Sequence, residues 1–331
     1  MKILVVGSGS WGSCLADLLA GKGHEVQLTC RRAEQVQEIN HERTNQHYLP
    51  NHRLAEGLIA IQGFDAVDAQ TELVVSVVPS SALASTMEAL SQKPFLSGVP
   101  IVSCTKGLEI ETGRRLSEVI QEYFPQNAMA VLSGPNHAEE ISAKLPACGV
   151  IGASSMELCS QLQEVFSTSY FRIYRSLDIA GIEYGGCIKN TYAIAAGIAA
   201  GMNLGDNAIA ALVTRALAEM ARLGVSLGGE LETFMGLSGV GDLITTCFSE
   251  HSRNNQVGRM LGKGMTLEEA VASLGMVAEG VRNTKATYQL VNQTGVDAPL
   301  IEAVYQILYE NIPANEALSQ LLSRELKSEF S

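Results

Sequence analysis

Basic residues are scarce in this sequence. Its 331 residues include 23 lysines and arginines against 35 aspartates and glutamates, which gives a net charge of -12 at pH 7. A protein that binds nucleic acid over a broad surface needs clustered positive charge, so we expect no nucleic-acid partner. A phosphate group on a ligand must instead be bound by a few placed cations and by backbone N–H groups.

The sequence also lacks paired cysteines. Its 7 cysteines are scattered, no Cys-x-x-Cys pair occurs, and no cysteine or histidine cluster has the spacing of a zinc site. Such a pattern fits small core residues in a reducing cytosol better than a disulfide framework. We therefore expect no bound metal and a cytoplasmic protein.

No apolar run is long enough to cross a membrane. The longest, residues 191–204, is rich in glycine and alanine and falls short of the roughly 20 residues that a spanning helix needs. The apolar start is interrupted by Gly7 and followed by Asp17, which argues against a signal peptide. We expect a soluble chain without membrane insertion, and its length suits two domains.

Over residues 1–178, short β-branched segments alternate with amphipathic helical segments. Helical patterns at residues 14–23, 82–92 and 113–124 lie between segments typical of strands. The strand segments are residues 2–7, 25–30, 73–78, 100–105, 128–134, 147–153 and 170–175. This alternation predicts an α/β fold, with a doubly wound, mostly parallel sheet covered by helices on both faces.

A glycine pattern follows the first strand and opens the first helix. Gly7, Gly9 and Gly12 form Gly-x-Gly-x-x-Gly. The first glycine permits a tight turn, the second lets a pyrophosphate approach the backbone, and the third lets the helix pack against the strand. The N–H groups at the helix N-terminus can then bind the phosphates. The pattern predicts a Rossmann-like, dinucleotide-binding domain.

After Arg175 the strand signal stops and helical periodicity continues to the end. The helical patterns cover residues 182–201, 207–224, 252–264, 266–275, 281–295 and 300–310. We predict an NAD(P)-binding Rossmann-like domain over residues 1–178 and an all-α domain over residues 179–331. The glycines and alanines of residues 182–201 would allow close helix packing.

The second strand ends in arginines where an acidic residue is usual. About 18 residues after Gly12, an NAD enzyme places a carboxylate on the ribose hydroxyls, but this chain has Cys30, Arg31 and Arg32. An arginine fork can hold a 2′-phosphate that a carboxylate would repel. The pattern favours NADP(H), with NAD(H) as a second cofactor. Alternatively, the arginines are solvated residues at the start of the next helix.

Further polar motifs lie at strand ends and in helices. They are Lys106 in TKGLE, Gly134 and Asn136 in SGPNHAEE, Lys189 in GGCIKNTYAIAAG, Asp242 in GVGD, and Ser252, Arg253 and Asn254 in SRN. In this order, over essentially the whole chain, the motifs resemble those of the bacterial NAD(P)-dependent glycerol-3-phosphate dehydrogenases. The resemblance implies a homodimer that reversibly reduces dihydroxyacetone phosphate to sn-glycerol 3-phosphate, the backbone of glycerophospholipids.

Three residues are expected to be catalytic. Hydride transfer to a ketone leaves an alkoxide that must be protonated, and the resemblance implies Lys189 as proton donor and acceptor. Lys106 would contact substrate and cofactor, and two neighbouring ammonium groups should lower each other's proton affinity. The resemblance places Asp242 beside them. Alternatively, the Lys189 side chain extends to water and Asp242 caps a helix.

The substrate phosphate is assigned to Arg253, because an arginine at a helix N-terminus suits a dianion. By resemblance, Gly134, Asn136, Ser252 and Asn254 also contact the substrate. Ordinary helix capping is the alternative for the SRN motif. The family commonly has Ser or Thr where Asn136 stands, but Asn keeps both donor and acceptor groups.

The remaining cofactor contacts are implied by resemblance alone. They are Ser10, Trp11, Lys106, Ala138, Arg253, Val277 and Glu279. On pattern alone, AEEI and VAEG are simply helix starts.

Rival functions follow from the same architecture. Two-domain dehydrogenases that act on β-hydroxy acids or ketopantoate would bind a carboxylate, and a non-catalytic nucleotide sensor would need no acid. GLSGVG lacks the Lys-Ser/Thr of a P-loop, so we do not expect a nucleoside triphosphatase.

Overall fold

One sheet organises the first half of the chain. The computed structural model describes residues 1–274, 278–326 and 328–329. Its strands lie in the order β3-β2-β1-β4-β5-β6-β7-β8. They are β1 Lys2–Val6, β2 Glu25–Cys30, β3 Leu58–Gln62, β4 Leu73–Ser76, β5 Ile101–Ser103, β6 Met129–Ser133, β7 Ala147–Ala153 and β8 Phe171–Ser176. All neighbours pair in parallel except β6 and β7, which are antiparallel.

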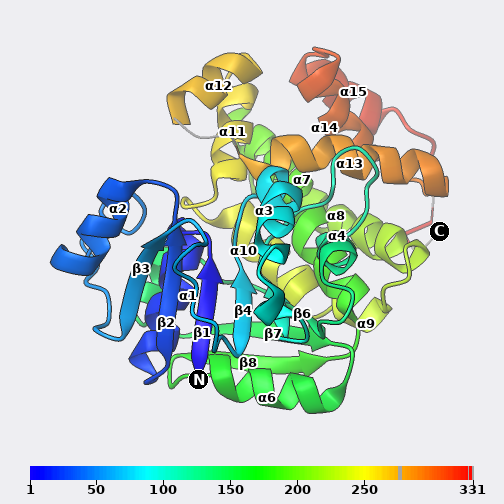
Figure 1. The fold of residues 1–331 in the computed structure, drawn as a ribbon. Coiled ribbons are helices and arrows are strands. Elements are labelled where there is room, and N and C mark those ends of the chain that lie inside the picture. Colours follow the sequence, from blue (N-terminus) through cyan, green and yellow to red (C-terminus); the bar gives the residue numbers. More distant parts are fainter. Residues whose placement is uncertain (275–277, 327, 330–331) are drawn as a thin grey trace.

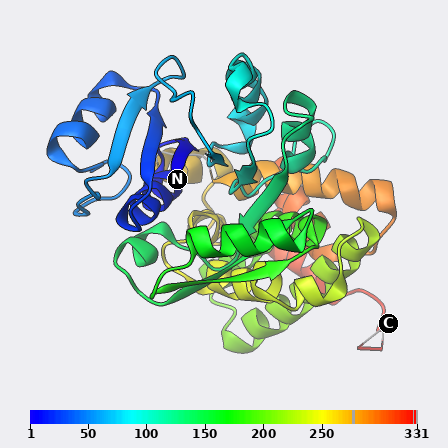
Figure 2. The same ribbon diagram turned by 60° about the horizontal axis from the view of Figure 1, so that its bottom comes forward.

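Helices cover both faces of this sheet, because successive strand residues point to opposite sides. The helices are α1 Ser10–Gly21, α2 Ala33–Gln37, α3 Ser80–Ser91, α4 Leu116–Tyr123, α5 Ala138–Ser142 and α6 Met156–Phe166. Ile3 and Val5 share a core with α1, α5 and α6, whereas Leu4 and Val6 share another with α3 and α4. Figure 2 shows α6 along the part of the sheet formed by β7 and β8. The predicted doubly wound α/β class is confirmed.

Strand β3 is not among the predicted strands. Its Ile59 is 57% exposed, and β3 pairs only with β2 at the edge of the sheet. An edge strand buries too few side chains to produce a continuous β-branched run. The antiparallel β6–β7 pair is also a departure from a purely parallel sheet, and only the short helix α5 connects the two strands.

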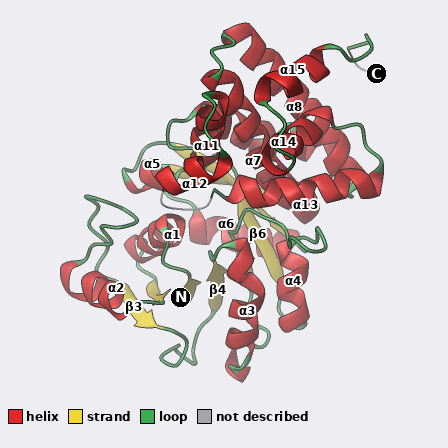
Figure 3. Ribbon diagram, turned by 90° about the horizontal axis from the view of Figure 1, so that it is seen from above, coloured by secondary structure: helices red, strands yellow, loops and turns green. Residues whose placement is uncertain are grey.

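The second half is helical, as predicted, and is built around α7. After Ser176 the described residues contain helices and no strand. Figure 3 shows this part lying to one side of the sheet. The helices are α7 Ile179–Gly201, α8 Asp206–Ser226, α9 Leu231–Phe234, α10 Asp242–Phe248, α11 Arg253–Gly262, α12 Leu267–Leu274, α13 Glu279–Thr294, α14 Pro299–Tyr309 and α15 Ala314–Leu322.

Glycines bring α7 and α11 into close contact. A Cβ on Gly197 would lie 2.2 Å from the carbonyl oxygen of Asn255, and one on Gly258 would lie 2.1 Å from that of Ile194. Both distances are shorter than a carbon atom can tolerate, so only glycine fits. The expected close packing of the glycine-rich helix therefore occurs, and it sets the position of the N-terminus of α11.

Among the described residues, no helix is both long and apolar enough to cross a bilayer.

Candidate active site

The glycine loop lies at the carboxyl edge of β1, where β1 separates β2 from β4. Gly7 has φ +111°, and a Cβ there would lie 2.7 Å from the Val77 oxygen. A Cβ on Gly12 would lie 1.8 Å from the Gly7 oxygen, whereas one on Gly9 would meet nothing within 4 Å. Thus two glycines serve packing and the middle one leaves open space. This edge is where doubly wound folds bind dinucleotides, and the loop fits a pyrophosphate.

Ser10 and Trp11 direct their side chains toward the protein. The Ser10 hydroxyl donates to the Tyr48 carbonyl oxygen at 2.8 Å. The Trp11 ring packs edge-on against Phe171, with the ring centroids 6.3 Å apart. Their backbone N–H groups, in the first turn of α1, are what these residues offer to a phosphate.

Arg31 and Arg32 follow β2 directly and are exposed. The backbone of Arg32 is the N-cap of α2. Within the described part of the chain, neither guanidinium group has a hydrogen-bond or ion-pair partner. The two cations are therefore available to a ligand, and they also occupy the helix-start position of the alternative interpretation.

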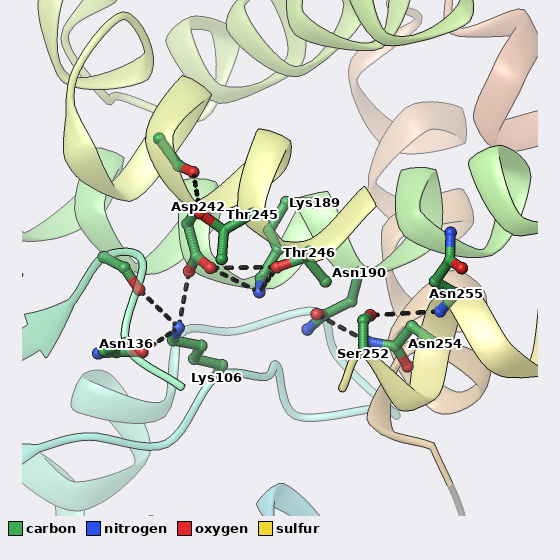
Figure 4. A network of polar contacts seen from close by, with 12 residues as sticks. Lys106, Asn136, Lys189, Asn190, Asp242, Thr245, Thr246, Ser252, Asn254 and Asn255 are labelled. Atoms are coloured by element: carbon green, nitrogen blue, oxygen red, sulfur yellow. Dashed lines mark hydrogen bonds and ion pairs between the residues drawn. The ribbon is translucent and has the colours of Figure 1, made fainter. Parts of the chain in front are cut away.

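Lys106, Lys189 and Asp242 meet in one buried cluster (Figure 4). The Lys106 ammonium donates to Asp242 Oδ2 at 2.7 Å, and the Lys189 ammonium donates to Asp242 Oδ1 at 2.8 Å. Lys189 is 5% exposed and Asp242 is 2% exposed. Lys189 therefore does not extend to water. The three residues come from the β5–α4 connection, α7 and α10, so the site joins both halves of the chain.

Asp242 is the first residue of α10 and follows the N-cap residue, Gly241. Its carboxylate accepts from the side chains of Lys106, Lys189 and Thr246, so Asp242 is not the N-cap that the alternative interpretation gave. Burial alone would raise the pKa of Asp242, but the two ammonium groups outweigh burial and hold the pKa below its usual range. Asp242 is thus a fixed negative charge between two cations.

The ammonium group of Lys106 loses its proton more readily than an ordinary lysine. Burial lowers its pKa from 10.5 to about 8, the positive charge of Lys189 acts in the same direction, and Asp242 acts against them. The expected mutual effect of the lysines is therefore present at Lys106. Lys106 also donates to the Gly134 carbonyl oxygen at 2.9 Å and to Asn136 Oδ1 at 2.6 Å.

Asn136 presents an unused donor beside Lys106. Its Nδ2 is buried and has no hydrogen-bond partner among the described residues. Leaving a buried N–H unpaired costs about 1–3 kcal/mol, so this group is well suited to an oxygen of a bound ligand. Gly134 has φ +130°, and a Cβ there would lie 3.1 Å from Gly149 Cα. Its carbonyl oxygen accepts from the Lys106 ammonium.

The SRN motif starts α11. The Ser252 hydroxyl accepts from the Asn255 N–H at 3.3 Å, which is the capping alternative. Asn254 donates to Asn190 Oδ1 at 2.9 Å and accepts from the Gly280 N–H at 2.9 Å. Arg253 is exposed, and its guanidinium has no partner within the described residues. It is free to bind an anion at the helix N-terminus.

Two polar residues of the site are absent from the predicted set. The Thr246 hydroxyl accepts from Lys189 and donates to Asp242 Oδ1 at 3.2 Å. Asn190 lies next to Lys189 in α7 and is 4% exposed. Thr246 could have been predicted from its spacing, because a residue four positions after Asp242 in a helix lies on the same face.

Two of the remaining predicted cofactor contacts, Ala138 and Glu279, lie at helix starts. Glu279 begins α13 and accepts a hydrogen bond from the Ser80 hydroxyl, at the start of α3, at 2.9 Å. Ala138 begins α5 and is 6% exposed. Val277 lies outside the described residues.

His137 directly precedes Ala138. Burial, together with the positive charges of Lys189 and Lys106, lowers the pKa of the His137 imidazole.

No group of three or more His, Cys, Asp or Glu side chains that could hold a metal ion occurs in the part of the chain that is described.

Sequence comparisons identify relatives along the whole chain. The family models for the NAD-dependent glycerol-3-phosphate dehydrogenase N-terminus and C-terminus match residues 2–159 and 178–319. The chain belongs to this dehydrogenase family. It is 48% identical to the glycerol-3-phosphate dehydrogenase [NAD(P)+] of Chlorobium phaeobacteroides (strain BS1), over 100% of this chain and 99% of the relative. It is 45% identical to that of Geobacter sp. (strain M21), over 99% and 98%.

Solved structures of the family agree with this membership. The glycerol-3-phosphate dehydrogenase from Coxiella burnetii is 37% identical and superposes with a TM-score of 0.92, over 98% of this chain and 99% of that one. The enzyme from Saccharomyces cerevisiae is 29% identical, with a TM-score of 0.83 over 97% and 99%. A D-mandelate dehydrogenase, with 16% identity and a TM-score of 0.64, shares the fold alone. The family, rather than the rival hydroxyacid enzymes, is thereby supported.

Proposed function

We propose that this protein catalyses the reversible reduction of dihydroxyacetone phosphate to sn-glycerol 3-phosphate, with NADPH preferred and NADH accepted. The observation that carries the proposal is the contact of Lys189 and Lys106 with the same Asp242 carboxylate, buried for Lys189 and partly buried for Lys106. Reduction of a ketone by hydride needs such a proton source next to the carbonyl oxygen, because the alkoxide that forms must be protonated. The names of the relatives at 44–48% identity support the substrate and the cofactors.

When bound, the nicotinamide supplies or accepts the hydride. The open space above Gly9 and the N–H groups at the start of α1 would hold its pyrophosphate, and Arg31 and Arg32 would bind a 2′-phosphate. Gly7 and Gly12 shape this loop. Lys106, Arg253, Ala138, Val277 and Glu279 remain assigned to the cofactor on resemblance.

Lys189 holds the proton that the substrate oxygen receives. Asp242 and Thr246 both bind its ammonium group, so they orient the proton donor. Lys106 and Asn136 offer donors to the same end of the substrate. In the reverse direction the Lys189 amine would take the hydroxyl proton.

The phosphate end of the substrate would lie at the N-terminus of α11. Arg253 supplies a charged fork and the first N–H groups of the helix supply partial positive charge. Ser252 and Asn254 hold this helix start in place through their own hydrogen bonds. Arg253 and the N-terminus of α11 would thus provide a local positive site for the substrate phosphate on a protein of net negative charge.

The organisation of the chain belongs to the same proposal. Residues 1–178 would form the NAD(P)-binding domain and residues 179–331 the helical substrate-binding domain, with the end of β8 at Ser176 and the start of α7 at Ile179 as support. We also propose a cytoplasmic homodimer that supplies glycerophospholipid synthesis. The free state of all the cysteines favours a reducing compartment.

The test is a steady-state assay of NADPH and NADH oxidation with dihydroxyacetone phosphate and with matched ketones that carry a carboxylate. We expect turnover with the phosphate and little with the carboxylates. Equal rates with both substrate classes would refute the assignment and support a hydroxyacid-type enzyme.

A variant of the proton donor separates an enzyme from a nucleotide sensor. Lys189→Met should lower kcat by about 10²–10⁴-fold, the usual contribution of a positioned acid, and leave NADPH binding nearly unchanged. Lys285→Met, at an exposed position of α13, is the matched control and should retain full turnover. Normal kcat in Lys189→Met would refute the mechanism.

A further inference from the structure

A ring of buried polar side chains lies behind the glycine loop, and the mechanism above does not use it. It consists of Ser8 in the loop, Ser13 in α1, Gln35 in α2, and Asn45 in the turn that follows a π-helix at Glu38–Glu42. Gln35 is 5% exposed, while Asn45 and Ser13 are 0% exposed. Buried amide groups are costly unless they are hydrogen-bonded. A cluster of them therefore points to a role for the hydrogen bonds that they make.

Three of these groups donate to one acceptor, the Ser8 carbonyl oxygen. Gln35 Nε2 lies at 2.9 Å from it, Asn45 Nδ2 at 3.1 Å and Ser13 Oγ at 3.3 Å. The other contacts complete the ring. Asn45 Nδ2 donates to Ser13 Oγ at 2.7 Å, Gln35 Nε2 donates to Asn45 Oδ1 at 3.3 Å, and Ser8 Oγ donates to Gln35 Oε1 at 3.1 Å.

This arrangement fixes the orientation of one peptide group. In a trans peptide, the C=O and the following N–H point in opposite directions, and the described chain has no cis peptide bond. With the Ser8 oxygen held on the buried side, the Gly9 N–H faces the other side. The space beside the Gly9 Cα is also open, since a Cβ on Gly9 would meet nothing within 4 Å. Within the described residues, the Gly9 N–H has no acceptor.

We propose that Gln35 and Asn45 are positioning residues that hold the Ser8–Gly9 peptide ready for the cofactor pyrophosphate. Without them the peptide would be free to rotate, and binding would have to order it, at a cost in affinity. The inference rests on the proposed function for the nature of the ligand, a nicotinamide dinucleotide. It assigns a role to two side chains that do not touch that ligand.

The predicted effect differs from that of the cations at the end of β2. The pyrophosphate is common to NADPH and NADH, so loss of either amide should weaken both cofactors by the same factor. Loss of Arg31 and Arg32 should weaken NADPH selectively. The ratio of the two dissociation constants therefore separates a loop-positioning role from a 2′-phosphate role.

The experiment uses Gln35→Met and Asn45→Leu, which roughly keep side-chain volume while removing the hydrogen bonds. Dissociation constants for NADPH and NADH are measured by fluorescence titration of the full-length protein, alongside Tm and kcat. We expect each constant to rise about tenfold, the equivalent of one good hydrogen bond, with kcat at saturating cofactor within about twofold of the wild type.

Asn127→Leu is the matched control. Asn127 is 4% exposed and donates to the Leu96 and Val99 carbonyl oxygens at 2.7 and 2.6 Å. It precedes β6 and so lies at the amino ends of the parallel strands, whereas the glycine loop lies at their carboxyl ends. This variant should lower Tm comparably but leave both dissociation constants within about twofold. Unchanged constants in folded Asn45→Leu, or an equal rise in Asn127→Leu, would overturn the proposal.

If Asn45→Leu does not fold, Ser13→Ala removes one donor to the same carbonyl and should raise both constants about threefold. Unchanged constants there would equally overturn the proposal. Because the readout is cofactor binding, a wild-type protein that bound NADPH but left dihydroxyacetone phosphate unreduced would refute the proposed function and leave this inference intact.

Discussion

At the scale of single residues, the balance of charge around Asp242 bears on how the site binds anions and on the pKa of Lys106. One carboxylate contacts two lysine side chains in a place where Asp242 is 2% exposed. A cluster with more cations than anions favours binding of an anionic oxygen. Burial lowers the pKa of Lys106, and the positive charge of Lys189 adds to this effect.

This balance predicts the alkaline limit of activity. The pKa of Lys106 is lowered from 10.5 to about 8, mainly by burial, so its charge is lost on raising the pH through 8 rather than through 10. We expect kcat/KM to fall above about pH 8 in the wild type. In Lys106→Arg, where the cation cannot be deprotonated, this limb should move to higher pH. Profiles of kcat/KM against pH would contradict the prediction if the wild type stayed flat to pH 10.

We also expect cofactor preference to depend on two single residues. Arg31 and Arg32 are exposed cations at the end of β2. Replacing both with alanine should raise the KM for NADPH about 10- to 100-fold, the value of one or two charged hydrogen bonds, and change the KM for NADH far less. Arg172→Ala, at an exposed position of β8, should change neither. Equal increases for the two cofactors would show that the arginines do not read the 2′-phosphate.

At the scale of elements, the crossing of α7 and α11 connects packing to chemistry. Helix α7 carries Lys189, and α11 begins with Arg253. The two groups proposed to act on opposite ends of the substrate therefore keep their separation only if these helices keep theirs. Glycines at the crossing allow backbone to approach backbone, so the spacing is set without flexible side chains.

Gly258→Ala tests that spacing. The added Cβ would lie 2.1 Å from the Ile194 carbonyl oxygen, so the helices must move apart, and overpacking of this kind costs about 1–3 kcal/mol. We expect the free energy of unfolding to fall by that amount in urea titrations, and the KM for dihydroxyacetone phosphate to rise. Gly21→Ala, in α1 with nothing within 4 Å of the added atom, should be neutral or slightly stabilising. A neutral Gly258→Ala would contradict the prediction.

At the scale of the whole molecule, what could be predicted follows from what repeats along the sequence. The alternation of buried strands with amphipathic helices specifies the doubly wound sheet, because both periodicities recur many times. A contact between two single residues does not repeat along the sequence, so no pattern predicts it. Lys106 and Asp242 are 136 residues apart, so only the resemblance placed them together. The role of Asp242 as a bridge, rather than a cap, requires the fold.

Global stability should depend on pH through the buried acid Glu219, which is not among the residues assigned to the substrate or the cofactor. Glu219 in α8 is 2% exposed and accepts the backbone N–H of Leu300 at 2.9 Å, at the start of α14. Burial raises its pKa from 4.5 to about 7, although the N–H groups of Leu300 and Ile301 act against burial. The folded protein therefore holds this proton more tightly than the unfolded chain does.

The sign of the effect follows from linkage. A raised folded pKa gives stability that is complete below pH 4.5 and is lost as the pH rises through 7, up to roughly 3 kcal/mol. Glu219→Gln, a neutral side chain that can still accept from Leu300, should remove this loss. Urea unfolding at pH 5 and pH 8 should thus show the wild type losing stability relative to Glu219→Gln, whereas Glu232→Gln, at an exposed position of α9, should follow the wild type. If the wild type and Glu219→Gln kept the same difference at both pH values, Glu219 would be charged throughout, and its carboxylate would act as a permanent cap of α14.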